Sequence, residues 1–522
     1  MKADIIIYNG IIHTMKKEDD IYKWMAIQDG KIIELGNEES YDSLIANTTE
    51  LINLDRRTVI PGMYDCHVHL VQSGLNSEGL DLLNVKSINE LLNLIKNKAK
   101  NYPLGQLIRG YHFDVTKIEE KRFPTRYELD SVSPEHPVWI NSIEYHTSAI
   151  NSLALNIVNL PYNIDGIKRD ERSLPLGYFT GKASAYIRNR LLAGIDDLTR
   201  ERGVQWTICQ AIKKGITTIN AMEGGFTFHE NDAKFVAKNK KRYPIDIRLF
   251  YQSFDLEKAA IIDSDSIGGD IFIDGAFNSR TAAISKKYND MDTYGNLYFN
   301  QDELNYFVSN VINNGYQLAL HAIGDRAIEQ TLNAYSDALN ENKYTDHRCR
   351  IEHFELATEE QIKKAKELNL IISVQPAFEY YWGHKKGMYE RRLDSSLSIR
   401  TNNFRKMIDR GLILCAGSDS DVTEINPILG IHASVNHPKS QHSIKVYEAL
   451  EMFTKNAAYA SFEETLKGSL EIGKLADFCI LSENIFEIDS KDIKTVKVSG
   501  TYKEGNAIYC ADDVVIEANS IE

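Results

Sequence analysis

Residues 59–70 read VIPGMYDCHVHL, an apolar run that ends in two histidines, His67 and His69. Residues two apart on an extended strand project to the same side, so both imidazoles could bind one metal ion. A single His-X-His pair is a weak signal. It gains weight here because three later apolar segments also end on potential ligands, at His321, His353 and Asp419.

The spacing of these residues predicts a (β/α)8 barrel. The interval from His321 to His353 is about one strand-helix unit of such a barrel, and the interval from His353 to Asp419 is about two. A strand is therefore expected in the second interval, and residues 370–376 supply one after a helix-like stretch. This register places strand one at His67, five at His321, six at His353 and eight at Asp419. Because the carboxyl ends of barrel strands converge on one mouth, these residues are expected to form a single site.

The remaining barrel strands are predicted from similar apolar runs. Strands two, three and four are expected at residues 215–222, 245–251 and 270–275. Far more residues separate strands one and two than a single crossover needs. We therefore predict an insertion at about residues 75–205, placed over the barrel mouth because the loops that follow strands build that face.

Short strands with turn signals occupy both ends of the chain. A hairpin signal stands at Asp29-Gly30, and a second turn lies at residues 504–506. Neither terminal segment is large enough to be stable alone, so we expect them to pair. The prediction is one composite β-sandwich from residues 1–58 and 466–522, flanking a barrel over residues 59–465.

Composition restricts the partners of the protein. The 522-residue chain has a formal charge of −14, which argues against general binding of nucleic acid or anionic membranes. Its six cysteines are scattered without a CxxC pair, and from the strand pattern at residues 1–10 and the lack of a long apolar stretch we expect neither a signal peptide nor a membrane span. We expect a cytoplasmic protein that acts on a small molecule, and the aromatic content of 10% permits the hydrophobic interface of a homodimer.

Four histidines and an aspartate at strand ends indicate a divalent metal site. Zinc is the favoured ion, while manganese, iron and nickel accept the same ligand types. Such an ion lowers the pKa of bound water toward ~7 and so generates hydroxide at neutral pH. Asp419 would accept the proton as general base and deliver it to a leaving group as general acid, which suits hydrolysis of a C–N bond. The alternative for each histidine is a hydrogen-bonded core residue.

These motifs resemble the signatures of the amidohydrolase superfamily, specifically its amidohydrolase-3, YtcJ-like branch. The resemblance runs nearly end to end, and implies a metal-dependent hydrolase with a (β/α)8 barrel and a composite β domain. It also assigns the ligand and catalytic positions to the four histidines and the aspartate above. The matching segments are residues 61–69, 272–275, 279–282, 321–328, 351–353, 417–419 and 468–477.

One departure from this pattern concerns the ligand between two metals. Many members carry on strand four a lysine, carboxylated by carbon dioxide, that bridges the ions, and the matching position here is Asp270. A short aspartate is not expected to reach as far. We therefore predict that Glu223, at the end of strand two, supplies the anionic ligand; the alternative is a solvated loop glutamate. One metal or two remain open.

Three further residues are weaker candidates. His146 lies where the family has an Asp-Gly-His-like segment, and is predicted to polarise a substrate carbonyl or bind a substrate end group, with a structural hydrogen bond as the alternative. Arg280 could hold a substrate carboxylate through its planar guanidinium, or pin its own loop. Trp382, in an aromatic run after strand seven, could wall an apolar pocket or pack within a loop.

The leading functional hypothesis is a hydrolase of a non-peptide amide, such as an N-acyl or N-formyl compound or an N-acyl amino acid. A deaminase of a small aminated ring is the nearest rival, because the same hydroxide could attack a ring carbon. A catalytically silent binding protein is the third alternative, since some related barrels have lost their metals. Retention of all four histidines and Asp419 argues against it.

Overall fold

The computed structural model describes residues 2–38, 40–115, 117–143, 147–341, 346–511 and 516–517. The chain divides into two compact units. The first contains Met1–His69, Ile208–Met222 and Val236–Glu522, and the second contains Leu70–Thr207 and Glu223–Phe235. Each unit has its own sheets and core.

A barrel sheet forms the centre of the first unit. Among the described residues it has eight strands in the order β21-β20-β19-β18-β17-β16-β15-β8, and a bridge between Val68 and Ser420 brings its two ends together. This nearly closed parallel sheet confirms the predicted (β/α)8 barrel. The strands are β8 (Met63–Val68), β15 (Ile216–Glu223), β16 (Asp246–Tyr251), β17 (Ser266–Phe272), β18 (Leu318–Ala322), β19 (Arg350–His353), β20 (Ile371–Val374) and β21 (Ile413–Ala416).

The barrel strands are buried along most of their length, as expected for parallel strands covered on both faces. All residues of β8, β18 and β19 are buried, including their histidines. The helices that alternate with these strands along the chain are α6 (Asp197–Ile212), α7 (Glu230–Asn239), α8 (Leu256–Ile261), α9 (Gln301–Asn313), α10 (Asp325–Glu341), α11 (Glu359–Glu367), α12 (Ala377–Trp382), α13 (Met388–Arg392), α14 (Ser395–Ser398), α15 (Phe404–Asp409), α16 (Pro427–Val435), α17 (Val446–Phe453) and α18 (Lys455–Ala460).

Helix α9 shows how the local sequence sets these elements. The Asn300 side chain accepts a hydrogen bond from the backbone N–H of Glu303, and the Glu303 carboxylate accepts one from the backbone N–H of Asn300, which forms a capping box. Leu304, Phe307 and Val308 then follow at helical spacing and are buried. A cap followed by an apolar stripe fixes both the start of the helix and its buried face.

Strand four differs from its prediction. It was expected at residues 270–275, but β17 begins at Ser266 and ends at Phe272. Gly268 and Gly269 lie inside it with φ of 90° and 96°, and the pairing with β18 shifts register between Gly268 and Phe272. The strand therefore contains an irregularity that only glycines adopt readily. Two adjacent glycines indicate a strand boundary in the sequence, which explains the error.

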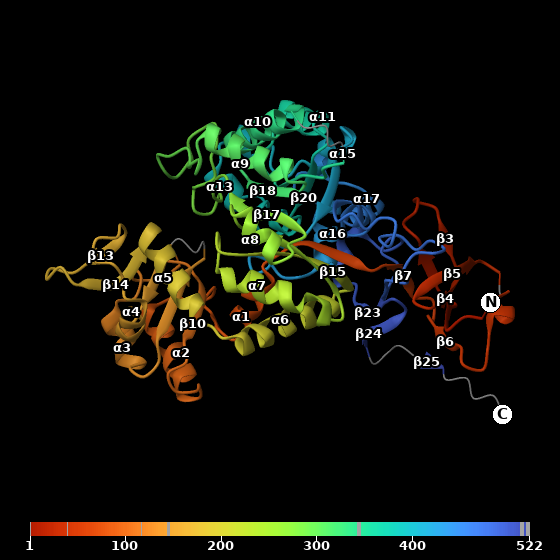
Figure 1. Ribbon diagram of the computed structural model, residues 1–522, viewed down its shortest axis with the longest axis horizontal. Helices are drawn as coiled ribbons and strands as arrows, with labels where there is room; N and C mark the ends of the chain where they lie inside the picture. Colours follow the sequence, from red (N-terminus) through yellow and green to blue (C-terminus); the bar gives the residue numbers. More distant parts are fainter. Residues whose placement is uncertain are drawn as a thin grey trace. The chain divides into compact units, whose positions relative to one another are not determined.

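Strands from both termini share two further sheets of the first unit, which confirms the composite β domain. Their orders are β25-β6-β1-β4-β5 and β24-β23-β22-β7-β2-β3, and red and blue strands lie together there in Figure 1. One core joins both ends of the chain, for example through Ile7, Met25, Phe478 and Tyr502. The strands are β1 (Ile5–Tyr8), β2 (Ile11–His13), β3 (Ile21–Tyr22), β4 (Trp24–Gln28), β5 (Lys31–Gly36), β6 (Glu50–Asn53), β7 (Thr58–Pro61), β22 (Phe478–Leu481), β23 (Val498–Lys503), β24 (Asn506–Cys510) and β25 (Ile516–Glu517).

The second unit contains most of the predicted insertion. Its sheet has the order β13-β14-β12-β11-β10-β9, packed around a core that includes Leu91, Ile108, Leu129 and Ile140. Its position over the barrel mouth stays a prediction. The elements are α1 (Leu70–Ser77), β9 (Leu80–Asp81), α2 (Ile88–Lys100), β10 (Ile108–Phe113), α3 (Arg126–Val132), β11 (Val138–Ser142), β12 (Thr147–Ile150), α4 (Ser152–Val158), β13 (Ile167–Arg169), β14 (Pro175–Thr180) and α5 (Gly181–Ala193).

Short 3-10 helices lie at Tyr41–Leu44, Lys240–Arg242, Ser440–His442 and Ser490–Thr495. None of the helices in the described ranges combines the length and the apolar character needed to cross a bilayer.

Candidate metal centre

Strands β8 and β21 bring three of the predicted ligands together. His67 and His69 are buried at the end of β8, and Asp419 follows β21 with a φ of 55°. The backbone N–H of Asp419 donates to the His67 carbonyl at 2.9 Å. As a result, one carboxylate oxygen of Asp419 lies 3.2 Å from Nε2 of His69 and 3.6 Å from Nε2 of His67.

Two residues hold these strand ends in contact. The buried Asp65 carboxylate accepts the backbone N–H groups of Ser418 at 2.8 Å and of His67 at 3.3 Å. Gly417 leaves room for this approach, because a Cβ at that position would lie 2.5 Å from the His67 nitrogen. A glycine and a buried carboxylate therefore fix the distance between His67 and Asp419.

The next pair of histidines comes from adjacent strands. His321 is on β18 and His353 ends β19, and their ring centroids lie 4.4 Å apart. His353 has a φ of 70° and the following residue, Phe354, a φ of 52°. Non-glycine residues rarely adopt this conformation, and it is concentrated at functional sites.

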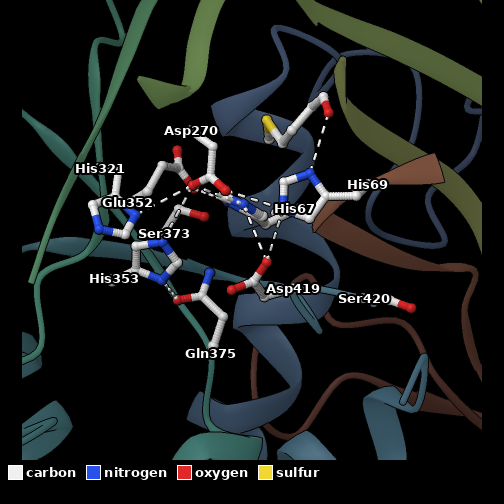
Figure 2. Close-up of polar contacts among 12 residues, drawn as sticks. His67, His69, Asp270, His321, Glu352, His353, Ser373, Gln375, Asp419 and Ser420 are labelled. Atoms are coloured by element: carbon white, nitrogen blue, oxygen red, sulfur yellow. Dashed lines mark hydrogen bonds and ion pairs between the residues drawn. The ribbon is translucent and has the colours of Figure 1, made fainter. Parts of the chain in front are cut away.

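Asp270 lies between the two pairs of histidines (Figure 2). One oxygen is 3.0 Å from Nε2 of His69, and the other is 3.3 Å from Nδ1 of His321 and 3.5 Å from Nε2 of His353. Two groups that could each hold a metal ion share this carboxylate: His67, His69, Asp270 and Asp419 form one, and Asp270, His321 and His353 form the other. The expectation that an aspartate is too short to reach this position is wrong.

Each of the four histidines also has a partner at its second ring nitrogen. Nδ1 of His67 and of His353 contacts a side chain, from Glu352 at 2.8 Å and from Gln375 at 2.7 Å. The other two contact backbone carbonyls: Nδ1 of His69 is 3.3 Å from Met222 O, and Nε2 of His321 is 3.4 Å from Gly275 O. Such contacts fix the tautomer and the orientation of metal-binding imidazoles. They leave one nitrogen of each ring toward Asp270.

The polar atoms at the centre of the cluster fit a bound cation. Nε2 of His67, Nε2 of His353 and Oδ1 of Asp419 are buried and make no hydrogen bond within the described part of the chain. Buried polar atoms are normally satisfied, so atoms that converge without such bonds suit a ligand. Nitrogen and carboxylate donors of this kind are those that zinc and similar ions take.

Charge within the cluster acts in the same direction. Burial lowers the pKa of His67, but the carboxylates of Asp270 and Asp419 outweigh it and raise this pKa to about 10. Burial raises the pKa of Asp270, but His67, His321 and His353 outweigh it and hold that pKa well below its usual range. Asp270 is therefore an anion in a buried site, and the cluster is suited to positive charge.

Sequence reasoning missed the ion pair behind His67. Glu352 is fully buried, and its carboxylate receives two contacts from Arg350, at 2.8 and 3.0 Å, as well as His67. Arg350 also donates to the Cys66 carbonyl and to the Ser373 hydroxyl. The available signal was two opposite charges inside the buried strand β19, where neither residue type is expected without a partner.

The structure does not bring Glu223 into either group of possible metal ligands. One oxygen of its buried carboxylate accepts the backbone N–H of Val71 at 2.9 Å. Its role as a ligand remains a prediction.

Of the three weaker candidates, two lie in described parts of the chain. The guanidinium of Arg280 pairs with Asp290 at 2.8 Å, a contact that pins its own loop. Trp382 packs on Phe378 with ring centroids 4.7 Å apart, and Phe378 stacks on His353 at 6.0 Å. An aromatic chain therefore runs outward from a candidate ligand. Substrate binding by Arg280 and Trp382 stays a prediction, and His146 falls outside the described residues.

Fold and site together define a (β/α)8-barrel protein with a candidate metal centre at the carboxyl ends of its strands. The sequence pattern of the amidohydrolase family matches residues 50–509, so the chain belongs to that family. This match confirms the family resemblance seen in the motifs.

Known proteins of similar sequence and fold support this assignment. The chain is 27% identical to the putative amidohydrolase YtcJ of Bacillus subtilis, over 98% of this chain and 99% of that protein. It is 24% identical to the N-substituted formamide deformylase of Arthrobacter pascens, over 96% of this chain and 97% of the relative. The crystal structure of an uncharacterized metal-dependent hydrolase from Pyrococcus furiosus shares the fold, with a TM-score of 0.76 and 23% identity, over 92% of this chain and 100% of that one.

Proposed function

We propose that this protein is a metal-dependent hydrolase that cleaves a non-peptide C–N bond in an N-formyl or N-acyl compound. The observation that carries the proposal is the convergence of four histidines with Asp270 and Asp419 at the barrel strand ends. Full-length similarity to an N-substituted formamide deformylase supports the choice of bond. When bound, a divalent cation would polarise the amide carbonyl and lower the pKa of water toward ~7.

Asp419 is proposed as the residue that moves the proton. Its carboxylate faces the histidine cluster, 3.2 Å from Nε2 of His69, and its backbone is tied to β8 by the bond to His67. From this position it would accept a proton from the attacking water and then donate it to the leaving nitrogen. The ligands of the candidate metal centre would orient the carbonyl group toward that water.

The aromatic chain from His353 is proposed to contact the acyl or amine part of the substrate. Phe378 is buried, whereas Trp382 is only partly buried at the end of α12. Aromatic walls with a few polar groups are typical of small-molecule sites. This arrangement favours substrates with an apolar substituent next to the scissile bond.

A substrate panel with two product assays tests the proposal. Metal-loaded protein is offered N-formyl amines, N-acyl amino acids and aminated ring compounds, while carboxylate and ammonia are measured in parallel. We expect formate or acetate to be released from the amides, and Asp419→Asn to lower kcat by about 10²–10⁴-fold through loss of general acid–base catalysis. Asp409→Asn is the matched control, because Asp409 pairs with Arg405 on α15.

Two outcomes would contradict this function. Ammonia from the ring compounds without carboxylate from the amides would identify a deaminase. Metal-loaded, folded protein that releases neither product from any compound would favour the silent binding protein.

A further inference from the structure

We propose that the carboxylate of Asp270 itself bridges two divalent cations, so that the metal centre assembles without carbon dioxide. This inference rests on the metal dependence in the proposed function, and it concerns the ligand rather than the reaction. A carboxylated lysine is the bridge that family resemblance implies at this position. Here the amino acid itself carries the carboxylate, and no covalent modification is needed.

Asp270 belongs to both groups of possible metal ligands. One oxygen lies 3.0 Å from Nε2 of His69, and the other lies 3.3 Å from Nδ1 of His321 and 3.4 Å from Nε2 of His67. The carboxylate therefore contacts histidines of both ligand groups, and a group in that position can serve both ions at once. The second group depends on it most, because without Asp270 it would retain only His321 and His353, whereas the first would keep His67, His69 and Asp419.

The irregular strand β17 explains how a short side chain reaches the centre. Gly268 and Gly269 have positive φ angles, and the register against β18 shifts beyond Gly268. A Cβ at Gly269 would lie 2.2 Å from the sulfur of Met222, and one at Gly268 would lie 1.9 Å from the Ala319 carbonyl oxygen. The β17 backbone thus runs closer to its neighbours than any side-chain-bearing residue would allow, which carries Asp270 inward.

No described lysine is available to act as the bridge. A carboxylated lysine that joins two buried ions must itself be buried. Among the described residues, Lys467 is the only lysine in that class, with 3% of its surface exposed. Its ammonium group donates a hydrogen bond to the Thr218 hydroxyl at 3.0 Å and pairs with Asp246. Neither partner is among the candidate metal ligands.

Glu223 is the remaining alternative for the anionic bridge. The matched variants Asp270→Asn and Glu223→Gln each remove one negative charge at nearly constant volume. Metal-free protein is incubated with excess Zn²⁺ or Mn²⁺ and dialysed, and bound metal is counted by elemental analysis. We expect two ions per chain in the natural protein and in Glu223→Gln, and at most one in Asp270→Asn. Two ions in Asp270→Asn, or one in the natural protein, would overturn the proposal.

Two measurements on the unchanged protein keep the proposal testable if Asp270→Asn does not fold. In the first, loading is repeated in buffer purged of carbon dioxide and in buffer with added bicarbonate. We expect equal metal content, whereas a bicarbonate requirement would point to a carboxylated lysine and refute the idea.

In the second, the Mn²⁺ form is measured by electron paramagnetic resonance. A shared carboxylate predicts a spin-coupled pair of ions, and a spectrum of isolated ions would count against it. None of these readouts depends on turnover. A protein with two coupled ions and no amidase activity would refute the proposed function and leave the role of Asp270 standing.

Discussion

Replacement of Glu352 by glutamine should weaken metal binding although all the proposed metal ligands are kept. The two oxygens of Glu352 receive three contacts, one from Nδ1 of His67 and two from Arg350. Glutamine offers one acceptor oxygen and one amide NH2, and the latter would face a donor. At least one of the three contacts must therefore be lost, and the buried Arg350 loses its counter-charge.

The expected loss of metal affinity and the expected loss of stability can both be estimated from these contacts. Loss of the partner that orients a metal-binding imidazole typically lowers affinity 10–100-fold, or about 1.4–2.8 kcal/mol. Breaking one side of a buried ion pair costs about 3–5 kcal/mol. We expect Glu352→Gln to lower the free energy of unfolding by about 3 kcal/mol, at the low end of this range, because glutamine keeps the volume of the side chain and one acceptor oxygen.

Competition with a chelator for Zn²⁺ measures the first effect, and urea unfolding of metal-free protein measures the second. Glu379→Gln is the matched control: Glu379 is equally buried and pairs with Lys439 at 3.2 Å. It should lose stability without losing metal affinity. If folded Glu352→Gln protein bound Zn²⁺ as tightly as the natural protein does, the idea that Glu352 orients His67 would be refuted.

Two further predictions concern strand contact and pH. Gly417→Ala places a Cβ 2.7 Å from Oδ1 of Asp65, so we expect about 1–3 kcal/mol less stability in urea unfolding and less bound metal; unchanged values of both would contradict the close contact. Burial lowers the pKa of His13 to about 4, so the unfolded chain binds a proton at this residue more tightly than the folded chain does. The contribution of His13 to the free energy of unfolding is therefore complete above pH 6.5 and falls as the pH drops toward 4. His13→Gln should reduce that fall, measured as unfolding free energy against pH, by about 3 kcal/mol; an equal slope in both proteins would argue against a neutral buried imidazole.

The barrel could be predicted because its strands leave local signals. A buried parallel strand is an apolar run, and in a barrel each run ends at the same mouth. Residues such as His321 and Asp419 therefore reveal strand ends and site positions together. Strand four was placed less well, since Gly268 and Gly269 look like a break although the strand continues through them.

The contacts between ligands could not be predicted in the same way. Whether Asp270 reaches the histidines depends on how far the register of β17 shifts against β18. The size of that shift cannot be predicted from the residue types alone. The partner of His67 was missed for a related reason: Glu352 lies on a different strand, and only the closed sheet brings them together. The sequence left Arg280 open between a substrate and its own loop; the structure adds the ion pair with Asp290, and substrate binding stays a prediction.

The pairing of β7 with β22 has a consequence for biosynthesis. Pro61 pairs with Phe478, so the ribosome must finish the whole barrel before β7 receives this neighbour. At ~5–20 residues per second, roughly 20–80 s pass with that edge unpaired. The nascent chain would thus expose an unpaired β-strand edge next to the strand that bears His67. Chaperone binding during this interval would protect that edge from aggregation.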